Sequence, residues 1–337
     1  MFSQDIILLA IFPMFVSFFI TYILIKRWIP IAHKLGYVGK DMNKYDHPKV
    51  AEIGGLYAII GTIFGLLIYV GVKSYILKTY DTLIYVFSII SLLSLVTILG
   101  LFDDILGWKK GLKTWQKLFL PLPLSLPLMV IPLDHTSINL LFIGTIDFGI
   151  FYSLLLIPLA ILGTANAVNM LAGYNGLEAA MSLMLLGAVS IKSFLMGQYF
   201  ITQISLIAIS SIIAFLIFNW YPAKVFPGNA FTFGIGSLFG ALVIFGNMEY
   251  FGLILFTLYF LELFLFLRGI FNGIYKENFG KPNEDGSLEL PYNKIYSVTH
   301  LSIKLNKIIF GKATEKNVVL FILLMQVLIT ILAFLII

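Results

Sequence analysis

Long apolar runs recur along this chain and constrain its fold more than any other feature. A helix needs roughly 20 apolar residues to cross a bilayer, and the sequence offers about ten such runs. They lie near residues 4–25, 53–72, 82–102, 115–133, 150–168, 178–196, 199–218, 231–247, 249–268 and 317–337. Only 12% of the 337 residues are charged, whereas soluble domains carry roughly 25%. We therefore expect an all-α polytopic membrane protein with about ten transmembrane helices.

The prolines and the missing cysteines refine this expectation. The fourth run carries Pro121, Pro123, Pro127 and Pro132. Each proline removes a backbone hydrogen bond, so we expect this span to be kinked or irregular. The chain has no cysteine, which excludes disulfides and thiolate metal sites.

The distribution of basic residues orients the expected spans. Cytoplasmic loops of membrane proteins are enriched in Lys and Arg. In the ten-span arrangement Lys73, Lys78 and Lys192 fall on one side, and the other 19 of the 22 basic residues fall on the opposite side. We therefore expect the basic side in the cytoplasm and both termini outside. Residues 1–337 would form one integral membrane domain, in which the long cytoplasmic loop 269–316 contains a turn typical of a short hairpin.

Two adjacent acidic residues, Asp103 and Asp104, directly follow the third apolar run. Charge is costly in hydrocarbon and is rarely placed beside it without a task. Adjacent carboxylates at a helix end can bind or orient Mg²⁺, or accept a proton. Lys113 follows far enough along the chain to fold back toward a bound phosphate. The alternative is a helix-end turn with solvated charges.

The segment 166–178 has the composition of a second binding element. Asn166 and Asn169 share one helix face, and the stretch from Gly173 to Asn175 then interrupts the helix. Amide oxygens are hard ligands that suit Mg²⁺, and amide groups also pair with the edges of nucleobases. The alternative is hydrogen bonding between membrane helices.

Two more loops on the same side combine glycine with polar residues. One is basic and holds Lys44, which suits phosphate, and Glu52 at the mouth of the second span. The other enters the eighth span and holds Phe226, which could stack on a planar base, and Asn229, which could offer an oxygen to a metal. The alternatives are a basic loop held at an anionic membrane surface and an interfacial aromatic belt.

Taken together, these segments resemble the polyprenyl-phosphate N-acetylhexosamine-1-phosphate transferase superfamily, and most of all its archaeal and eukaryotic dolichyl-phosphate branch. The segments that carry the resemblance are Gly-Lys-Asp-Met-Asn-Lys (39–44), Glu-Ile-Gly-Gly (52–55), Phe-Asp-Asp-Ile-Leu-Gly-Trp (102–108), Asn-Ala-Val-Asn-Met-Leu-Ala-Gly-Tyr-Asn-Gly-Leu-Glu (166–178) and Asn-Trp-Tyr-Pro-Ala-Lys-Val-Phe-Pro-Gly-Asn-Ala-Phe (219–231). They follow the order typical of that family. Its topology also has ten spans with both ends outward.

The resemblance implies a transferase that moves N-acetylhexosamine-1-phosphate, expected to be GlcNAc-1-phosphate, from a UDP-sugar to a polyprenyl or dolichyl phosphate and releases UMP. This is the first step of lipid-linked glycan assembly, as in protein glycosylation or cell-envelope synthesis. Mg²⁺, with Mn²⁺ as an alternative, would neutralise charge on the diphosphate. The enzyme would lie in the cell membrane of a prokaryote or archaeon, or in the ER membrane of a eukaryote, with a cytoplasmic site. The resemblance allows a homodimer and implies no nucleic-acid partner.

Carried over by position, the resemblance also implies site residues. Asn169 and Asn229 would be metal ligands. Asp103 and Asp104 would orient the acceptor phosphate or the metal, with Asp104 a candidate base, and Lys113 would meet phosphate. Uridine would be held by Gly173, Asn175 and Phe226, and Glu52 would line the donor pocket. The full set implied to bind substrate is Lys44, Glu52, Gly173, Asn175, Phe226, Lys281 and His300.

Two departures from the family pattern keep alternatives open. Where the family usually has Gly-Asp-Thr or Gly-Asp-Ala, this chain has Gly-Asn-Ala at 228–230. A neutral amide attracts a cation less strongly, so a catalytically impaired member acting as a membrane scaffold is one alternative. The last cytoplasmic loop lacks the Arg-His-Arg or triple-His cluster of relatives. Lys276, Lys281 and His300 are the nearest substitutes, which leaves the choice of sugar open.

Two further alternatives come from other classes of membrane protein. A secondary transporter would suit intramembrane acids and broken helices, but the sequence has no inverted repeat and its polar clusters lie at one face. An intramembrane prenyltransferase uses paired Asp-rich motifs, and this chain has only one Asp pair of that kind.

Overall fold

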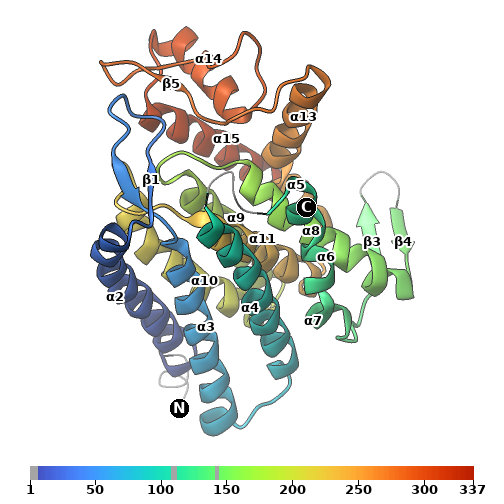
Figure 1. The fold of residues 1–337 in the computed structure, drawn as a ribbon. Coiled ribbons are helices and arrows are strands. Elements are labelled where there is room, and N and C mark those ends of the chain that lie inside the picture. Colours follow the sequence, from blue (N-terminus) through green and yellow to red (C-terminus); the bar gives the residue numbers. More distant parts are fainter. Residues whose placement is uncertain (1–6, 108–111, 141–143) are drawn as a thin grey trace.

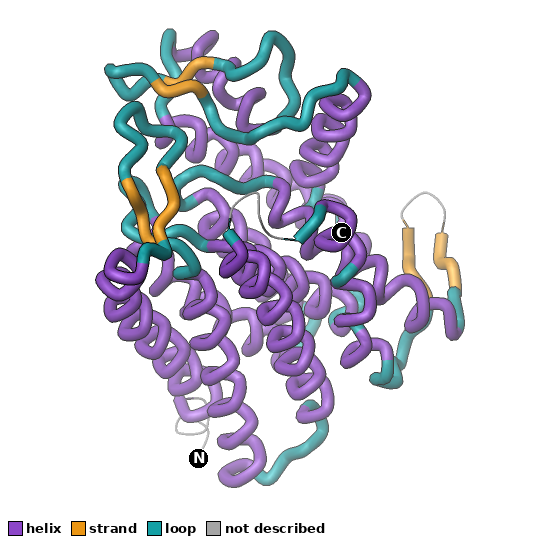
Figure 2. The backbone as a smooth tube through the Cα atoms, in the orientation of Figure 1, coloured by secondary structure: helices purple, strands orange, loops and turns teal. Residues whose placement is uncertain are grey.

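Helices make up most of the computed structural model, which describes residues 7–107, 112–140 and 144–337 (Figure 2). Within these residues, eight helices are long and apolar enough to cross a membrane. They are built on α2 (Phe12–Leu35), α3 (Gly55–Gly71), α4 (Leu83–Leu106), α8 (Ile157–Met170), α9 (Leu177–Leu195), α10 (Tyr199–Asn219), α11 (Gly228–Phe245) and α15 (Glu315–Ile336). Three of them are extended by π-helical turns at Ile7–Ile11 (η1), Val72–Leu77 (η2) and Tyr152–Leu156 (η3).

Two of the expected spans are broken. The proline-rich fourth run forms three short helices, α5 (Thr114–Phe119), α6 (Pro121–Leu124) and α7 (Leu126–Met129). The ninth run forms α12 (Glu249–Leu255) and α13 (Thr257–Phe271), which are bent by 58° and together are long enough for one span. The irregular fourth span agrees with the proline content, and the count of ten stays a prediction.

Short hairpins and one further helix complete the fold. The strand pairs are β1 (Val38–Lys40) with β2 (Lys49–Ala51), β3 (Ser137–Leu140) with β4 (Gly144–Asp147), and β5 (Lys281–Pro282) with β6 (Leu288–Glu289), all antiparallel. The helix α14 (Val298–Phe310) is capped by the Ser297 hydroxyl. We call residues 272–314, which include β5, β6 and α14, the cap. The cap lies at one end of the bundle next to the β1 hairpin, and β3 and β4 project from the side (Figure 1).

The helix α11 forms the centre of the bundle. Every residue from Ala230 to Phe245 is buried, and the helix packs against α4 and α8. Small residues permit this close packing, as is usual between membrane helices. A Cβ at Gly236 would lie 2.4 Å from the Thr164 carbonyl oxygen, and one at Gly100 would lie 2.5 Å from the Ala230 backbone. The position of the α11 N-terminus is therefore fixed by backbone contact with α4.

This packing predicts the effect of adding one methyl group to the core. Gly236→Ala should lower the stability of the folded protein by about 1–3 kcal/mol, because the new Cβ meets backbone atoms that cannot give way. Gly163→Ala is the matched control, since a Cβ at that position of α8 meets open space. Thermal unfolding of both variants in detergent checks the prediction. Equal unfolding temperatures for the two variants would contradict it.

Candidate active site

The ends of three helices bring the predicted polar residues together. Asp103 and Asp104 lie in the last turn of α4, Asn169 lies in the last turn of α8, and Asn229 lies in the first turn of α11. These segments are far apart in sequence, and they meet because both α4 and α8 pack against α11.

Asp104 caps the N-terminus of α11. Its Oδ1 accepts a hydrogen bond from the Asn229 N–H at 2.7 Å, and its Oδ2 accepts one from the Ala230 N–H at 3.1 Å. The first N–H groups of a helix lack partners within the helix and carry partial positive charge, so a carboxylate is well suited to this place. Gly228 allows the approach, because it has a φ of +74° and a Cβ there would lie 2.5 Å from Asp104 Oδ2.

Asp103 is buried, with 3% of its surface exposed, and is held from three sides. Its Oδ1 accepts a hydrogen bond from the Leu112 N–H at 2.7 Å. Its Oδ2 lies 2.6 Å from the Lys117 ammonium and 2.5 Å from the Asn229 amide nitrogen. A buried carboxylate needs such compensation, because charge without a partner is costly away from water.

Lys117 is a site residue that the sequence reasoning missed. Lys113 was expected to fold back toward the site, but its side chain is exposed, and its backbone N–H donates to Gln116 Oε1. Lys117 instead lies one turn into α5 and pairs with Asp103. A lysine within a predicted apolar run requires a partner, and that signal could have pointed to Lys117. A contact of Lys113 with phosphate stays a prediction, and Trp108 lies outside the described residues.

The two asparagines predicted to bind metal are linked through Thr232. The Thr232 hydroxyl donates to Asn169 Oδ1 at 3.2 Å and also lies 3.3 Å from the Asn229 carbonyl oxygen. Carboxylate and amide oxygens from three helix ends therefore gather in one place.

This donor set fits Mg²⁺, which prefers hard oxygen ligands and keeps several waters or substrate phosphates in its shell. Within the described ranges, no group of three or more His, Cys, Asp or Glu side chains is placed to hold a metal ion. A cation here would therefore rely on the amide oxygens of Asn169 and Asn229 and on the substrate.

Asn175 is part of a clasp that joins four segments. Its Oδ1 accepts hydrogen bonds from the Lys44 ammonium at 3.0 Å and the Ala223 N–H at 2.7 Å, and its Nδ2 donates to Asp41. Its backbone N–H donates to Glu315 Oε1 at 2.8 Å. The sequence predicted Lys44 and Asn175 as substrate-binding residues, and the structure brings them together. The Asn175 side chain is 3% exposed and already bonded, which identifies it as a structural link in this conformation.

Lys44 is charged within this clasp. Its ammonium pairs with Asp41 and, at 3.0 Å, with Glu315, and it lies 4.6 Å from the centre of the Tyr221 ring. Burial alone would lower the pKa of Lys44, but the carboxylates of Glu315 and Asp41 outweigh burial and raise it. The positive charge of Lys44 is therefore used within the protein.

Backbone pairing places Phe226 beside Glu52. The Phe226 N–H donates to the Ala51 carbonyl at 2.7 Å, and the Gly54 N–H donates to the Phe226 carbonyl at 2.9 Å. The Glu52 carboxylate lies over Gly39, where a Cβ would come within 2.3 Å of Oε1. Burial raises the pKa of Glu52. Phe226 and Glu52, both predicted to bind substrate, therefore lie in neighbouring segments that are joined by backbone hydrogen bonds.

Gly173 connects the 171–176 loop to the cap. It has a φ of +108°, and a Cβ there would lie 2.9 Å from the Phe279 ring. Its N–H donates to Glu178 Oε1 at 2.8 Å, and its carbonyl accepts from the Asn43 amide at 2.9 Å. Glycine is favoured at this position by both the positive φ and the nearby ring.

His300 and Lys276 of the cap are both buried within the protein. His300 was expected to bind substrate, but it is fully buried and packs against the Tyr292 ring at 5.5 Å between centroids. Burial, with the nearby Lys276 charge, lowers the pKa of His300 to about 4, so the ring is neutral at physiological pH. Lys276 is itself buried and paired with Glu262. Neither residue offers a free charge to a ligand.

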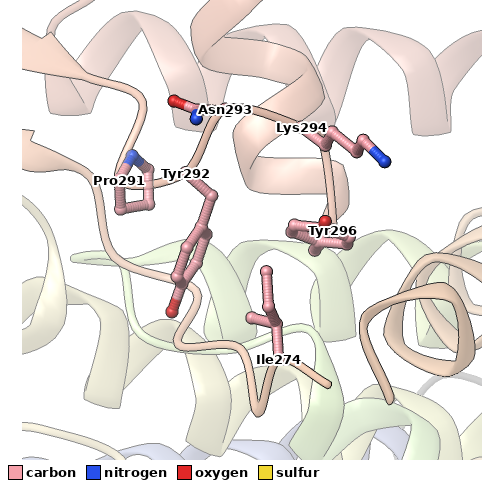
Figure 3. Close-up of a pocket in the computed structure, with 6 residues that line it drawn as sticks. All are labelled: Ile274, Pro291, Tyr292, Asn293, Lys294 and Tyr296. Atoms are coloured by element: carbon pink, nitrogen blue, oxygen red, sulfur yellow. The ribbon is translucent and has the colours of Figure 1, made fainter. Parts of the chain in front are cut away.

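Two open cavities lie on the cap. One, of about 320 Å³, is lined by Lys281 together with Met42, His47, Phe279 and other residues. The other, of about 400 Å³, is lined by Ile274, Pro291, Tyr292, Asn293, Lys294 and Tyr296 (Figure 3). Of the predicted site residues only Lys281 lines either cavity, and its contact with a substrate stays a prediction.

Known proteins are similar to this chain over most of its length. Residues 86–247 match the model of glycosyl transferase family 4. A Saccharolobus solfataricus protein named as a UDP-N-acetylglucosamine–dolichyl-phosphate N-acetylglucosaminephosphotransferase is 39% identical over 89% of this chain and 90% of its own length. A Sulfolobus acidocaldarius protein with the same name is 34% identical over 94% of this chain and 93% of its own length. A Streptococcus thermophilus phospho-N-acetylmuramoyl-pentapeptide-transferase is 33% identical over 49% of this chain and 50% of its own length.

The matched family region includes the Asp pair, both asparagines and the core helix α11. The two archaeal relatives extend the likeness to 89% and 94% of the chain. The chain is therefore an integral membrane member of glycosyl transferase family 4.

Proposed function

We propose that the protein transfers GlcNAc-1-phosphate from UDP-GlcNAc to dolichyl phosphate and releases UMP. The observation that carries this proposal is the identity with two archaeal relatives of that name over most of the chain. The gathering of Asp103, Asp104, Asn169 and Asn229 at one set of helix ends supports it. In the reaction, a phosphate oxygen of the lipid attacks the β-phosphorus, and the bond from that phosphorus to the bridging oxygen breaks as UMP leaves.

The charges of the site favour a cation as part of this reaction. Donor and acceptor are both anionic, so they repel each other as they approach. Lys117 is committed to Asp103, and Lys44 is committed to Asp41 and Glu315. We propose Mg²⁺, with Mn²⁺ as an alternative, held by Asn169 and Asn229 through their amide oxygens. When bound, the cation would neutralise charge on the phosphates.

The chain's own residues have distinct roles in this proposal. Asp104 holds the α11 N-terminus, and through it Asn229, at a fixed position. Lys113 is exposed just before α5, and we propose that its ammonium contacts a substrate phosphate. Phe226 and Glu52 lie in paired backbone segments, and we propose that they contact the nucleoside, with the Phe226 ring stacked on uracil.

We propose that this site faces the cytoplasm and that the chain crosses the membrane ten times with both termini outside. The excess of basic residues on the side of the Asp pair supports this orientation. The broken runs 115–133 and 249–268 would each count as one span in that topology.

The direct test is a reconstituted reaction. Purified full-length protein in detergent with Mg²⁺, dolichyl phosphate and radiolabelled UDP-GlcNAc should form a lipid-linked product and UMP. UDP-GalNAc and undecaprenyl phosphate, tested in parallel, would show the selectivity for sugar and lipid. Absence of product with every donor and acceptor would favour the impaired, scaffold-type member that Asn229 suggests.

Substitution of Asn229 tests its role as a metal ligand. Asn229→Leu removes the amide oxygen and should lower turnover by about 100-fold or more, a larger loss than expected for a residue outside the metal shell. Asn229→Asp should keep or raise the affinity for Mg²⁺, because a carboxylate attracts the cation more strongly. Turnover and its dependence on Mg²⁺ concentration check both variants. Unchanged turnover in the Leu variant would remove Asn229 from the site.

Variants of Lys117 and Lys113 distinguish a lysine that stabilises the Asp103 carboxylate from one that contacts the substrate. Lys117→Met leaves the buried Asp103 charge without its partner and should destabilise the protein by about 2 kcal/mol, less than the 3–5 kcal/mol typical of a fully buried pair. Lys117→Arg keeps the charge and should restore most of that loss. Lys113→Met should leave the unfolding temperature unchanged and lower turnover only. Equal unfolding temperatures for Lys117→Met and the wild type would show that the ion pair contributes no stability.

A further inference from the structure

The two ends of the Asn229 side chain face different partners. Its nitrogen lies 2.5 Å from Asp103 Oδ2. An ionised carboxylate accepts hydrogen bonds and cannot donate them, so the amide atom facing it must be the N–H₂ group. The amide oxygen Oδ1 therefore points away from Asp103. In the part of the chain that the structure describes, no hydrogen-bond donor reaches that oxygen.

Asp103 is well placed to fix this orientation. Its carboxylate is almost fully buried and is held by the Lys117 ammonium at 2.6 Å and the Leu112 N–H at 2.7 Å. Both contacts place a positive charge or an N–H donor against the carboxylate oxygens. The charge of Lys117 balances that of Asp103, and the neutral amide of Asn229 adds no further charge. The three side chains thus form a unit that is complete without a metal ion.

We propose that Asp103 is a positioning residue for Asn229: it turns the amide so that Oδ1 is presented to the cation, and with Lys117 it holds this geometry before any cation binds. The proposal rests on the proposed function, because it names how the chain prepares one of the two metal ligands of that site. It assigns different tasks to the adjacent aspartates. Asp104 holds the backbone of Asn229 and Asp103 holds its side chain.

The proposal explains how the site accommodates asparagine at this position. An aspartate at position 229 would place a second carboxylate against Asp103 Oδ2, where two ionised groups repel each other. Only a cation or a proton between them would relieve that repulsion. The native pair needs neither, so the wild-type site should keep its geometry in EDTA, and added Mg²⁺ should raise its stability only by the mass action of binding.

The test is a charge-conserving exchange of the two side chains. Full-length wild type, Asp103→Asn, Asn229→Asp and the double variant Asp103→Asn/Asn229→Asp are purified in detergent at pH 8. Their thermal unfolding is measured in EDTA and in Mg²⁺, and Mg²⁺ affinity is measured by titration calorimetry. In EDTA, Asn229→Asp should unfold at a lower temperature than the wild type, and Mg²⁺ should restore the loss. The double variant should unfold near the wild-type temperature without Mg²⁺, because the amide introduced at position 103 can then donate to the carboxylate introduced at position 229.

The affinity for Mg²⁺ gives an independent reading. Asp103→Asn alone should weaken Mg²⁺ binding by about 10-fold, the lower end of the loss seen when a residue that orients a metal ligand is changed. The added Asp103→Asn change should rescue Asn229→Asp in EDTA. The proposal would be overturned if Asp103→Asn lowered the unfolding temperature in EDTA equally in the wild-type and the Asn229→Asp backgrounds. The two side chains would then act independently.

A control variant separates this pair from a general effect of charge. Asn166 lies in the same final turns of α8, and its amide nitrogen donates to the Leu162 and Leu118 carbonyls. Asn166→Asp adds one negative charge at the same end of the bundle, and Asp103→Asn should not rescue it. Rescue of Asn166→Asp would attribute the effect to net charge and overturn the proposal. Since the unfolding data in EDTA need no substrate, a wild type that forms no lipid-linked product would refute the proposed function and leave this test valid.

Discussion

The N-terminus of α11 is the constraint on which the site depends. Its first N–H groups have no partner within the helix, and the helix begins among other helices rather than in open water. Asp104 supplies the missing acceptors from the end of α4. This contact requires α4 and α11 to approach closely, and the glycines at positions 100 and 228 make that approach possible. The same contact sets Asn229 beside Asp103, so the architecture of the bundle and the geometry of the site have one origin.

Most of the charge near this site serves to hold it together. Lys117 compensates Asp103, and Lys44 compensates Asp41 and Glu315. Buried ion pairs of this kind add little net stability, but removal of one partner is costly because the other charge is left alone. Among the described residues, neither of these two lysines is left unpaired for an anion that enters the site. Under the proposed function, a bound cation would supply positive charge that Lys117 and Lys44 do not.

The sequence predicted structure well where the pattern that determines it lies within one short segment. Apolar runs of bilayer length predicted the long helices, and prolines predicted the irregular segment that became α5, α6 and α7. The amide and acidic residues at the ends of α4, α8 and α11 were also predicted as one cluster. Signals that depend on distant partners were not readable. Nothing in the sequence after the Asp pair shows which lysine would pair with Asp103, and in the structure it is Lys117.

The burial of side chains in the cap was equally hidden. His300 follows a segment of mixed polar and apolar residues, and the fold of the cap buries it beside Tyr292. Asn175 lies in a segment whose amide groups suggested nucleotide binding. Its partners Asp41 and Glu315 come from segments on either side of it in the chain. Such pairings arise from the topology of the whole bundle and leave no local pattern.

The clasp around Asn175 has a consequence for the order in which contacts form during folding. Lys44 and Glu315 are 271 positions apart, yet their side chains are 3.0 Å apart in the folded chain. The bond between Lys44 and Glu315 can therefore form only after α15 has been synthesised and has packed against the β1–β2 hairpin loop. Without α15 the bonds from Asn175 to Lys44, Asp41 and Ala223 could still form, but both bonds to Glu315 would be missing. The Lys44 hairpin and the 171–176 loop therefore reach their full set of contacts only when α15 has packed beside them.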